Sequence, residues 1–557
     1  MVSLRPAEQI MRLDRMGASH QTRLSFMRAL VRRMSKERWR FERLRFDLDP
    51  DGYGTSIFAI HTPNRTYSLI AFTHALDPDQ RTDRVIAEAL DATFSLFDGV
   101  PTDADLARLA HNTPKQEVGR FSSTELVLAR ANKSLRAFEH VVECLADGRQ
   151  PDIDFLARVG YLMRTTAVYG SGKFGCADRG RISERSDTRG PFQVEMLTVY
   201  LIRWFTMELV EYVARARGGN RAAKLDAAVK RFLGIGNATG LGMAPFLVKH
   251  PILINNWVLA RETALARVRA LKLASEEQLS ELHKLMRRVR RHLEEWNVDD
   301  EIQQARTSTL RNEMEDFERR LSDDGLLSEK RPWDMLYLYA ETNYSLEGQE
   351  LAASLLMEPH AQLVDDLAET MCSDRSTCLK PSMSVAELQA SITTRYGWAL
   401  MRDYDDPDEQ RYFWYYSEDK LEPRFSDRFA EPGTEYEMPL AFGRDIAALD
   451  MELARAEPSS SVAKFLLVHP EFRHVVRRVQ TTANFPYSEI HDSLIASDVR
   501  PIDLLRFKLA FFGASKFDPK SDLWTRITMF QGAPMPDDLG GPGSDDWFFP
   551  VKPEVTR

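Results

Sequence analysis

Three short runs of strand-forming residues follow one another between positions 41 and 75, at residues 43–46, 56–60 and 67–72. The sequences Asp49-Pro50-Asp51-Gly52 and Thr62-Pro63-Asn64-Arg65 separate these runs, and both have the composition of tight turns. The pattern therefore predicts a three-stranded antiparallel meander.

Apolar residues then recur at spacings of three and four, which is the helical period. This pattern predicts helices over residues 83–97, 102–110, 122–145 and 154–166. Residues 191–217 are apolar on nearly all sides, and a helix of that kind belongs in a core.

Residues 275–321 predict a pair of helices with heavily charged outer faces. Ser275 and Gln278 match a capping box at the start of the first helix. The sequence Asn297-Val298-Asp299-Asp300 interrupts the apolar spacing, so we expect an antiparallel helical hairpin. Such a hairpin is either a packed arm or a surface for homodimer formation.

Several short sequences return in the same order near the end of the chain. Residues 168–175 resemble 511–518, and residues 150–156 resemble 500–505. We interpret these matches as a diverged internal duplication. The expected fold is α+β and mainly α-helical, with two related halves joined by the helical hairpin. Each half has a small antiparallel β-meander followed by helices.

Changes in pattern along the chain divide it into five expected regions. They are a basic N-terminal helical arm (1–40), a first half with strands, helices and two glycine-rich loops (41–260), the charged hairpin (261–330), a helical connector (331–390) and a second half (391–557). The arm has the spacing of a basic amphipathic helix that docks on the body. Contact with a membrane surface and a role in targeting are the alternatives.

Composition narrows the class of protein. A chain of 557 residues with 43% hydrophobic and 28% charged residues is typical of globular proteins with more than one core. The net charge of −9 argues against nucleic acid as a partner. Four cysteines without metal-ligand spacing indicate reduced thiols in a cytoplasmic protein. No apolar run reaches the roughly 20 residues that cross a bilayer.

Two glycine-rich stretches are the best candidates for a binding site. The first, Gly170-Ser171-Gly172-Lys173-Phe174-Gly175, fits G-x-G-x-x-G literally but lacks the strand–helix context of a dinucleotide site, and it lacks the hydroxyl that follows the lysine of a P-loop. Glycine lets backbone N–H groups approach a ligand, and a lysine adds a positive charge. We therefore expect Lys173, Arg164, Ser171 and Gly172 to bind an anion. The alternative is a glycine-rich connector whose basic residues face water.

The second stretch covers residues 234–242 and leads toward a predicted helix, whose N-terminus favours anions. Asn237, Thr239 and Gly240 are its expected ligand-binding residues. Tight helix packing is the alternative reason for its four glycines.

His250 and Glu117 are the best candidates for proton transfer by residue type. No metal-ligand spacing is present, and the sequence indicates no particular cofactor. We expect an enzyme that acts on a small anionic metabolite, carboxylated or phosphorylated, through a reaction that the sequence does not define. The alternative is a non-catalytic scaffold that binds a partner through the helical hairpin.

Overall fold

The computed structural model describes most of the chain. The residues it does not describe are 1, 78–89, 113–122, 170–184, 241–250, 323–324, 326–328, 373–378, 407–413, 418–422, 426–436, 440–442, 492–499, 522–523 and 555–557. The fold is α+β, with 55% of residues in helices and 14% in strands.

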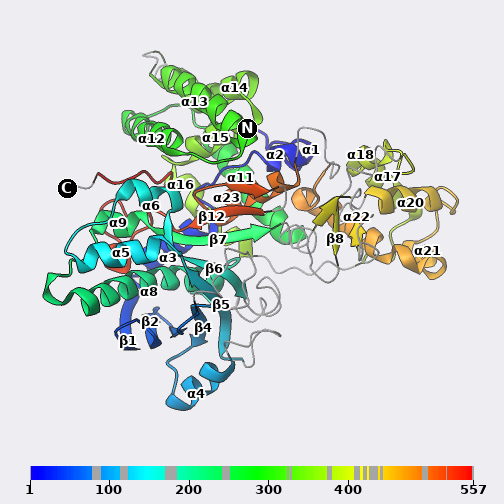
Figure 1. The fold of residues 1–557 in the computed structure, drawn as a ribbon. Coiled ribbons are helices and arrows are strands. Elements are labelled where there is room, and N and C mark those ends of the chain that lie inside the picture. Colours follow the sequence, from blue (N-terminus) through cyan, green and yellow to red (C-terminus); the bar gives the residue numbers. More distant parts are fainter. Residues whose placement is uncertain are drawn as a thin grey trace.

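A nine-stranded mixed sheet forms the centre of the fold, in the order β1-β2-β3-β4-β5-β6-β7-β12-β11. Its strands are β1 Arg40–Leu48, β2 Gly54–His61, β3 Thr66–Thr73, β4 Ala92–Asp98, β5 Glu125–Lys133, β6 Tyr161–Tyr169, β7 Gly234–Gly240, β11 Asp518–Ser521 and β12 Trp524–Met529. The first three strands pair antiparallel, which confirms the predicted meander. The last two come from the C-terminal part of the chain, so the sheet joins distant segments (Figure 1).

One long helix, α8 Gln193–Gly218, packs along the sheet (Figure 1). Apolar residues on most of its sides are buried, as the predicted all-round apolar pattern requires. Shorter helices complete this region, namely α4 Asp103–Asn112, α5 Ala137–Ala146, α6 Ile153–Val159 and α9 Ala227–Phe232. Helix α5 packs against α8, and both contribute to the main hydrophobic core.

Three predicted helices are wrong in part, because strands form within their ranges. Residues 125–133, expected inside a helix over 122–145, form β5, and residues 161–166 begin β6. Residues 92–98, at the end of the helix expected over 83–97, form β4. Strands β4 and β5 are buried on both faces. A strand buried on both faces is apolar at consecutive positions, so its pattern does not distinguish it from a buried helix.

A group of helices lies at one end of the molecule, at the top of Figure 1. Its members are α12 Glu276–Glu295, α13 Glu301–Leu321, α14 Pro332–Asn343 and α15 Leu346–Met357. Helix α11 Pro251–Arg269 contacts α14 and α15, and the chain continues after α15 into α16 Ala361–Val364 and the 3₁₀ helix η7 Asp365–Cys372. Arg311 of α13 donates to the carbonyl of Leu293 in α12 at 2.8 Å, so these two helices lie side by side. Their expected role as a link between two related halves is not confirmed.

A second, smaller hydrophobic core lies among α17 Val385–Arg395, α18 Gly397–Leu400, α20 Gly443–Leu453, α21 Val462–Val468 and α22 Arg473–Asn484. These helices form a body at the right of Figure 1. A three-stranded sheet in the order β10-β8-β9 belongs to the same stretch of chain, with strands β8 Trp414–Ser417, β9 Pro423–Phe425 and β10 Glu437–Pro439. The chain then passes through η12 Pro501–Arg506 and α23 Phe507–Phe512 to the main sheet.

The expected internal duplication is not confirmed. The segment before the first glycine-rich stretch is strand β6, whereas the corresponding residues before Gly513 form helix α23. Tyr53-Gly54 also resembles Tyr396-Gly397 in sequence, yet the first pair leads into a strand, whereas Gly397 begins a helix. Matches of a few residues leave backbone conformation open, because packing against distant residues decides it.

The N-terminal residues belong to the core of the molecule. Helices α1 Ala7–Ile10, α2 Leu13–Met16 and α3 Phe26–Lys36 contribute buried residues to the main cluster. Arg5, Arg15 and Arg28 are buried and form ion pairs with glutamates of later helices or their ends. These arginines are therefore internal partners of acidic residues rather than a basic surface for a membrane. Among the described residues, no helix combines the length and apolarity needed to cross a membrane.

Candidate functional site

Strands β6 and β7 run parallel, whereas their other neighbours in the sheet, β5 and β12, run antiparallel to them. Thr165 of β6 lies opposite Asn237 of β7. Because the strands are parallel, their carboxyl ends, Tyr169 and Gly240, lie at the same edge of the sheet. The first glycine-rich stretch thus follows β6, and the second begins within β7, which is the adjacent strand.

Local sequence explains where β6 begins. Asp152 caps the start of helix α6, because its carboxylate accepts the N–H of Asp154 at 2.8 Å. Gly160, with φ of 80°, caps the end of the helix. Glycine is favoured at such a position because it adopts the left-handed conformation easily. Aromatic and β-branched residues follow at once, and they favour the extended strand.

The second glycine-rich stretch is a strand up to Gly240, which corrects the expected loop. A Cβ on Gly234 would lie 2.4 Å from the carbonyl oxygen of Met529. A Cβ on Gly236 would lie 2.6 Å from the ring of Tyr161. These two glycines therefore allow β7 to pack closely between the neighbouring strands β6 and β12, whereas the alternative drawn from the sequence was tight packing of helices.

The structure brings two predicted ligand-binding residues onto neighbouring strands. Arg164 of β6 is 7% exposed and lies opposite Gly236, the residue that precedes Asn237. The side-chain amide of Asn237 donates to Oγ1 of Thr165 at 3.1 Å. Asn237 is thus fixed by β6, and Thr165 is a residue of this site that the sequence did not single out.

Thr239 and Gly240 occupy the end of β7, where they lie opposite Thr525 and Trp524 of β12. Gly240 is therefore the last described residue of β7. Side-chain contacts of Thr239 lie outside the described residues.

The remaining predicted residues, Lys173, Ser171, Gly172, His250 and Glu117, lie outside the described residues. Chain connectivity still relates their segments to the sheet. Ser171 is two positions beyond the end of β6, and the segment with His250 follows β7 directly. Glu117 belongs to the segment that enters β5, whose Leu128 lies opposite Tyr169. All three segments thus join the sheet at the edge where β6 and β7 end.

Polar residues at the opposite end of β5 have a structural role. Asn132 accepts the N–H of Asp91 at 2.9 Å, and the Asp91 carboxylate accepts the N–H of Lys133 at 3.0 Å. The Lys133 ammonium lies 4.9 Å from the centre of the Phe138 ring, within the range of a cation–π contact. These contacts fix the start of β4 against β5.

Within the described residues, no group of three or more His, Cys, Asp or Glu side chains is arranged to hold a metal ion. The described cysteine, Cys144, is a free buried thiol whose pKa is raised by burial. No protein-family model, curated protein or solved structure matches the chain.

Proposed function

We propose that the protein is an enzyme for a small anionic metabolite, carboxylated or phosphorylated, which binds at the edge of the sheet where β6 and β7 end. The observation that carries this proposal is the parallel pairing of these two strands. In open sheets, ligands bind beyond the carboxyl ends of parallel strands, where connecting segments from adjacent strands meet. Here the segment that follows β6 is rich in glycine and carries Lys173, and β7 itself contributes Gly234, Gly236 and Gly240.

Charge favours an anion at this position. Lys173 follows the end of β6 by four residues and supplies positive charge next to this edge, whereas Arg164 lies within β6, five residues before the strand ends at Tyr169. Backbone N–H groups of glycine-rich segments add further donors. The proposed ligand-binding residues are Lys173, Arg164, Ser171, Gly172, Asn237, Thr239 and Gly240.

His250 and Glu117 are the proposed groups for proton transfer. Both belong to segments that join the sheet at this edge, one after β7 and one before β5. A general acid or base must lie within hydrogen-bond reach of the proton that it transfers. Because both segments join the sheet at the same edge, they begin on the same side of the sheet. The reaction type follows from the ligand, once that is identified.

A thermal-shift screen tests the proposal. Phosphorylated and carboxylated metabolites should raise the melting temperature in a saturable way, because a ligand that binds only the folded state stabilises it. Lys173→Met should weaken the shift while leaving the melting temperature without ligand nearly unchanged. Lys224→Met, at an exposed lysine outside the site, is the matched control and should retain the full shift.

The scaffold alternative gives a different result in the same screen. A protein that only recruits a partner through residues 261–330 would show no saturable shift with any anion. It would instead form a homodimer or a complex that substitutions on α12 or α13 disrupt. A cytoplasmic location is part of the proposal, since the buried thiol of Cys144 is unpaired.

A further inference from the structure

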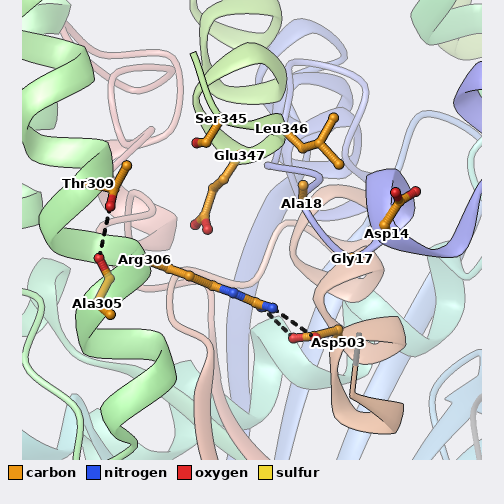
Figure 2. Close-up of a pocket in the computed structure, with 10 residues that line it drawn as sticks. All are labelled: Asp14, Gly17, Ala18, Ala305, Arg306, Thr309, Ser345, Leu346, Glu347 and Asp503. Carbon is orange, nitrogen blue, oxygen red and sulfur yellow. Dashed lines mark hydrogen bonds and ion pairs between the residues drawn. The ribbon is translucent and has the colours of Figure 1, made fainter. Parts of the chain in front are cut away.

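A cleft separate from the β6–β7 edge lies where the N-terminal segment meets α13, α15 and η12 (Figure 2). Its volume is about 360 Å³, within the range of small-molecule sites. Its lining residues are Asp14, Gly17, Ala18, Ala305, Arg306, Thr309, Ser345, Leu346, Glu347 and Asp503.

Of the polar residues that line this cleft, Asp503 is the most buried and Glu347, in the first turn of α15, is the next. The residue is 7% exposed, and its Oε1 accepts a hydrogen bond from the guanidinium of Arg506. His20 Nε2 lies 3.6 Å from the same oxygen. Among the described residues, no hydrogen bond reaches Oε2. Figure 2 shows the carboxylate pointing toward Arg306 across the cleft.

The partners of Glu347 keep it charged. Burial by itself would raise the pKa of this carboxyl, but the charge of Arg506 and the His20 imidazole outweigh burial and lower the pKa to about 2. Burial lowers the pKa of His20, so the imidazole is neutral at neutral pH. Arg506 is fully buried and also donates to Gln303 at 3.0 Å, which fixes its position.

The hydrogen-bond donors around the cleft are already engaged by the protein. Arg306 donates two bonds to Asp503, at 2.6 and 3.1 Å. The hydroxyl of Ser345 donates to Glu313 at 2.9 Å, and that of Thr309 donates to the Ala305 carbonyl at 3.2 Å. A ligand must therefore supply the hydrogen-bond donors itself. Oε2 of Glu347, a side chain that is nine-tenths buried, can accept hydrogen bonds from them.

We propose that this cleft binds a small organic ammonium ion, with its N–H groups directed at Oε2 of Glu347. Asp14 adds a second carboxylate on the same cavity, with 24% of its side chain exposed, and this carboxylate also pairs with Arg12 at 2.6 Å. Charge-assisted bonds to a carboxylate in a partly buried site are stronger than those between neutral groups. An anion is disfavoured there, because the cationic lining residue Arg306 is held by Asp503.

The experiment compares two molecules of the same length, 1,4-diaminobutane and 1,4-butanediol, in thermal-shift and calorimetric titrations of the full chain. The diamine should bind in a saturable way and the diol should not, because only the diamine carries charged N–H donors. Glu347→Gln keeps the shape but removes the charge, and it should weaken diamine binding at least tenfold. Equal binding of diamine and diol, or no binding of the diamine, overturns the proposal.

A second variant keeps the test decisive if Glu347→Gln does not fold. Ala305→Leu fills the cleft from α13 without altering a charged group, and it should also weaken diamine binding at least tenfold. Thr342→Leu, at an exposed site on α14, is the control and should bind as the unmodified protein does. Unchanged binding in Ala305→Leu would assign the diamine to the acidic surface and refute the cleft. Anion binding at the β6–β7 edge is independent of both outcomes.

Discussion

The buried ion cluster that holds the N-terminal residues should lose much of its stabilising effect when one carboxylate is neutralised. Glu350 of α15 accepts bonds from Arg5 at 2.7 Å and from Arg15 at 2.8 Å. Arg261 lies 3.4 Å from its second oxygen, and Glu262 is the remaining acid. Glu350→Gln therefore leaves three buried guanidinium groups with one carboxylate.

The size of the effect follows from burial. The side chains of Arg5, Arg15 and Glu350 are at most 8% exposed, and removal of one partner from a buried ion pair costs about 3–5 kcal/mol. An unfolding entropy of about 2 cal/mol/K per residue gives roughly 1 °C per kcal/mol for cooperative unfolding of the whole chain. We expect the melting temperature to fall by about 3–4 °C, and by more if a smaller unit unfolds first.

The assay is differential scanning calorimetry of the purified variants at neutral pH. Glu315→Gln is the matched control, because Glu315 lies 3.7 Å from Arg290 on the surface with 58% of its side chain exposed. Surface pairs of this kind contribute about 0–1 kcal/mol. Arg15→Met in the Glu350→Gln background should cost less than it does alone, since it removes an unpaired charge. A Glu350→Gln variant as stable as the Glu315→Gln control would refute the stabilising role of the cluster.

Two further predictions concern stability. Burial lowers the pKa of His292 from 6.5 to about 4. As the pH drops, this histidine is therefore protonated in the unfolded state before it is protonated in the folded state. The free energy of unfolding should fall by up to about 3 kcal/mol between pH 6.5 and pH 4. His292→Gln should flatten the plot of melting temperature against pH in this window, and a parallel plot would contradict this. Gly236→Ala should lower the melting temperature by an amount equivalent to about 1–3 kcal/mol, because its Cβ meets the Tyr161 ring. Gly397→Ala, whose Cβ meets no atom within 4 Å, is the control, and an equal effect in both would refute the packing role.

Elements with a distinct pattern could be predicted from the sequence. The meander has runs of strand-forming residues separated by turn residues, and α8 is apolar over many consecutive turns, so both were identified. Strand β7 could not be identified in this way, since its glycines lack the side chains that reveal a strand. Only the position of the Tyr161 ring and of the β12 backbone explains why glycine is needed there.

Pairing between distant residues explains most of what the sequence did not predict. Arg5 and Glu350 are 345 positions apart, so neither residue indicates its partner. In the sequence, the N-terminal arginines consequently resemble the polar face of a surface helix. The ammonium cleft was missed for the same reason, because Asp14, Glu347 and Asp503 come from three distant segments. For the proposed anion site, the sequence identified the two glycine-rich stretches, and the structure adds that the strands before the first and within the second, β6 and β7, are parallel.

The most direct test of the proposed anion site is a crystal structure of the protein grown with the tightest-binding anion from the thermal-shift screen. The account predicts that the anion lies within hydrogen-bond distance, about 3 Å, of Lys173 Nζ and of backbone N–H groups beyond the ends of β6 and β7. Lys173 in solvent, more than about 15 Å from Asn237 and with the anion elsewhere, would contradict it, since no single small ligand could contact both residues.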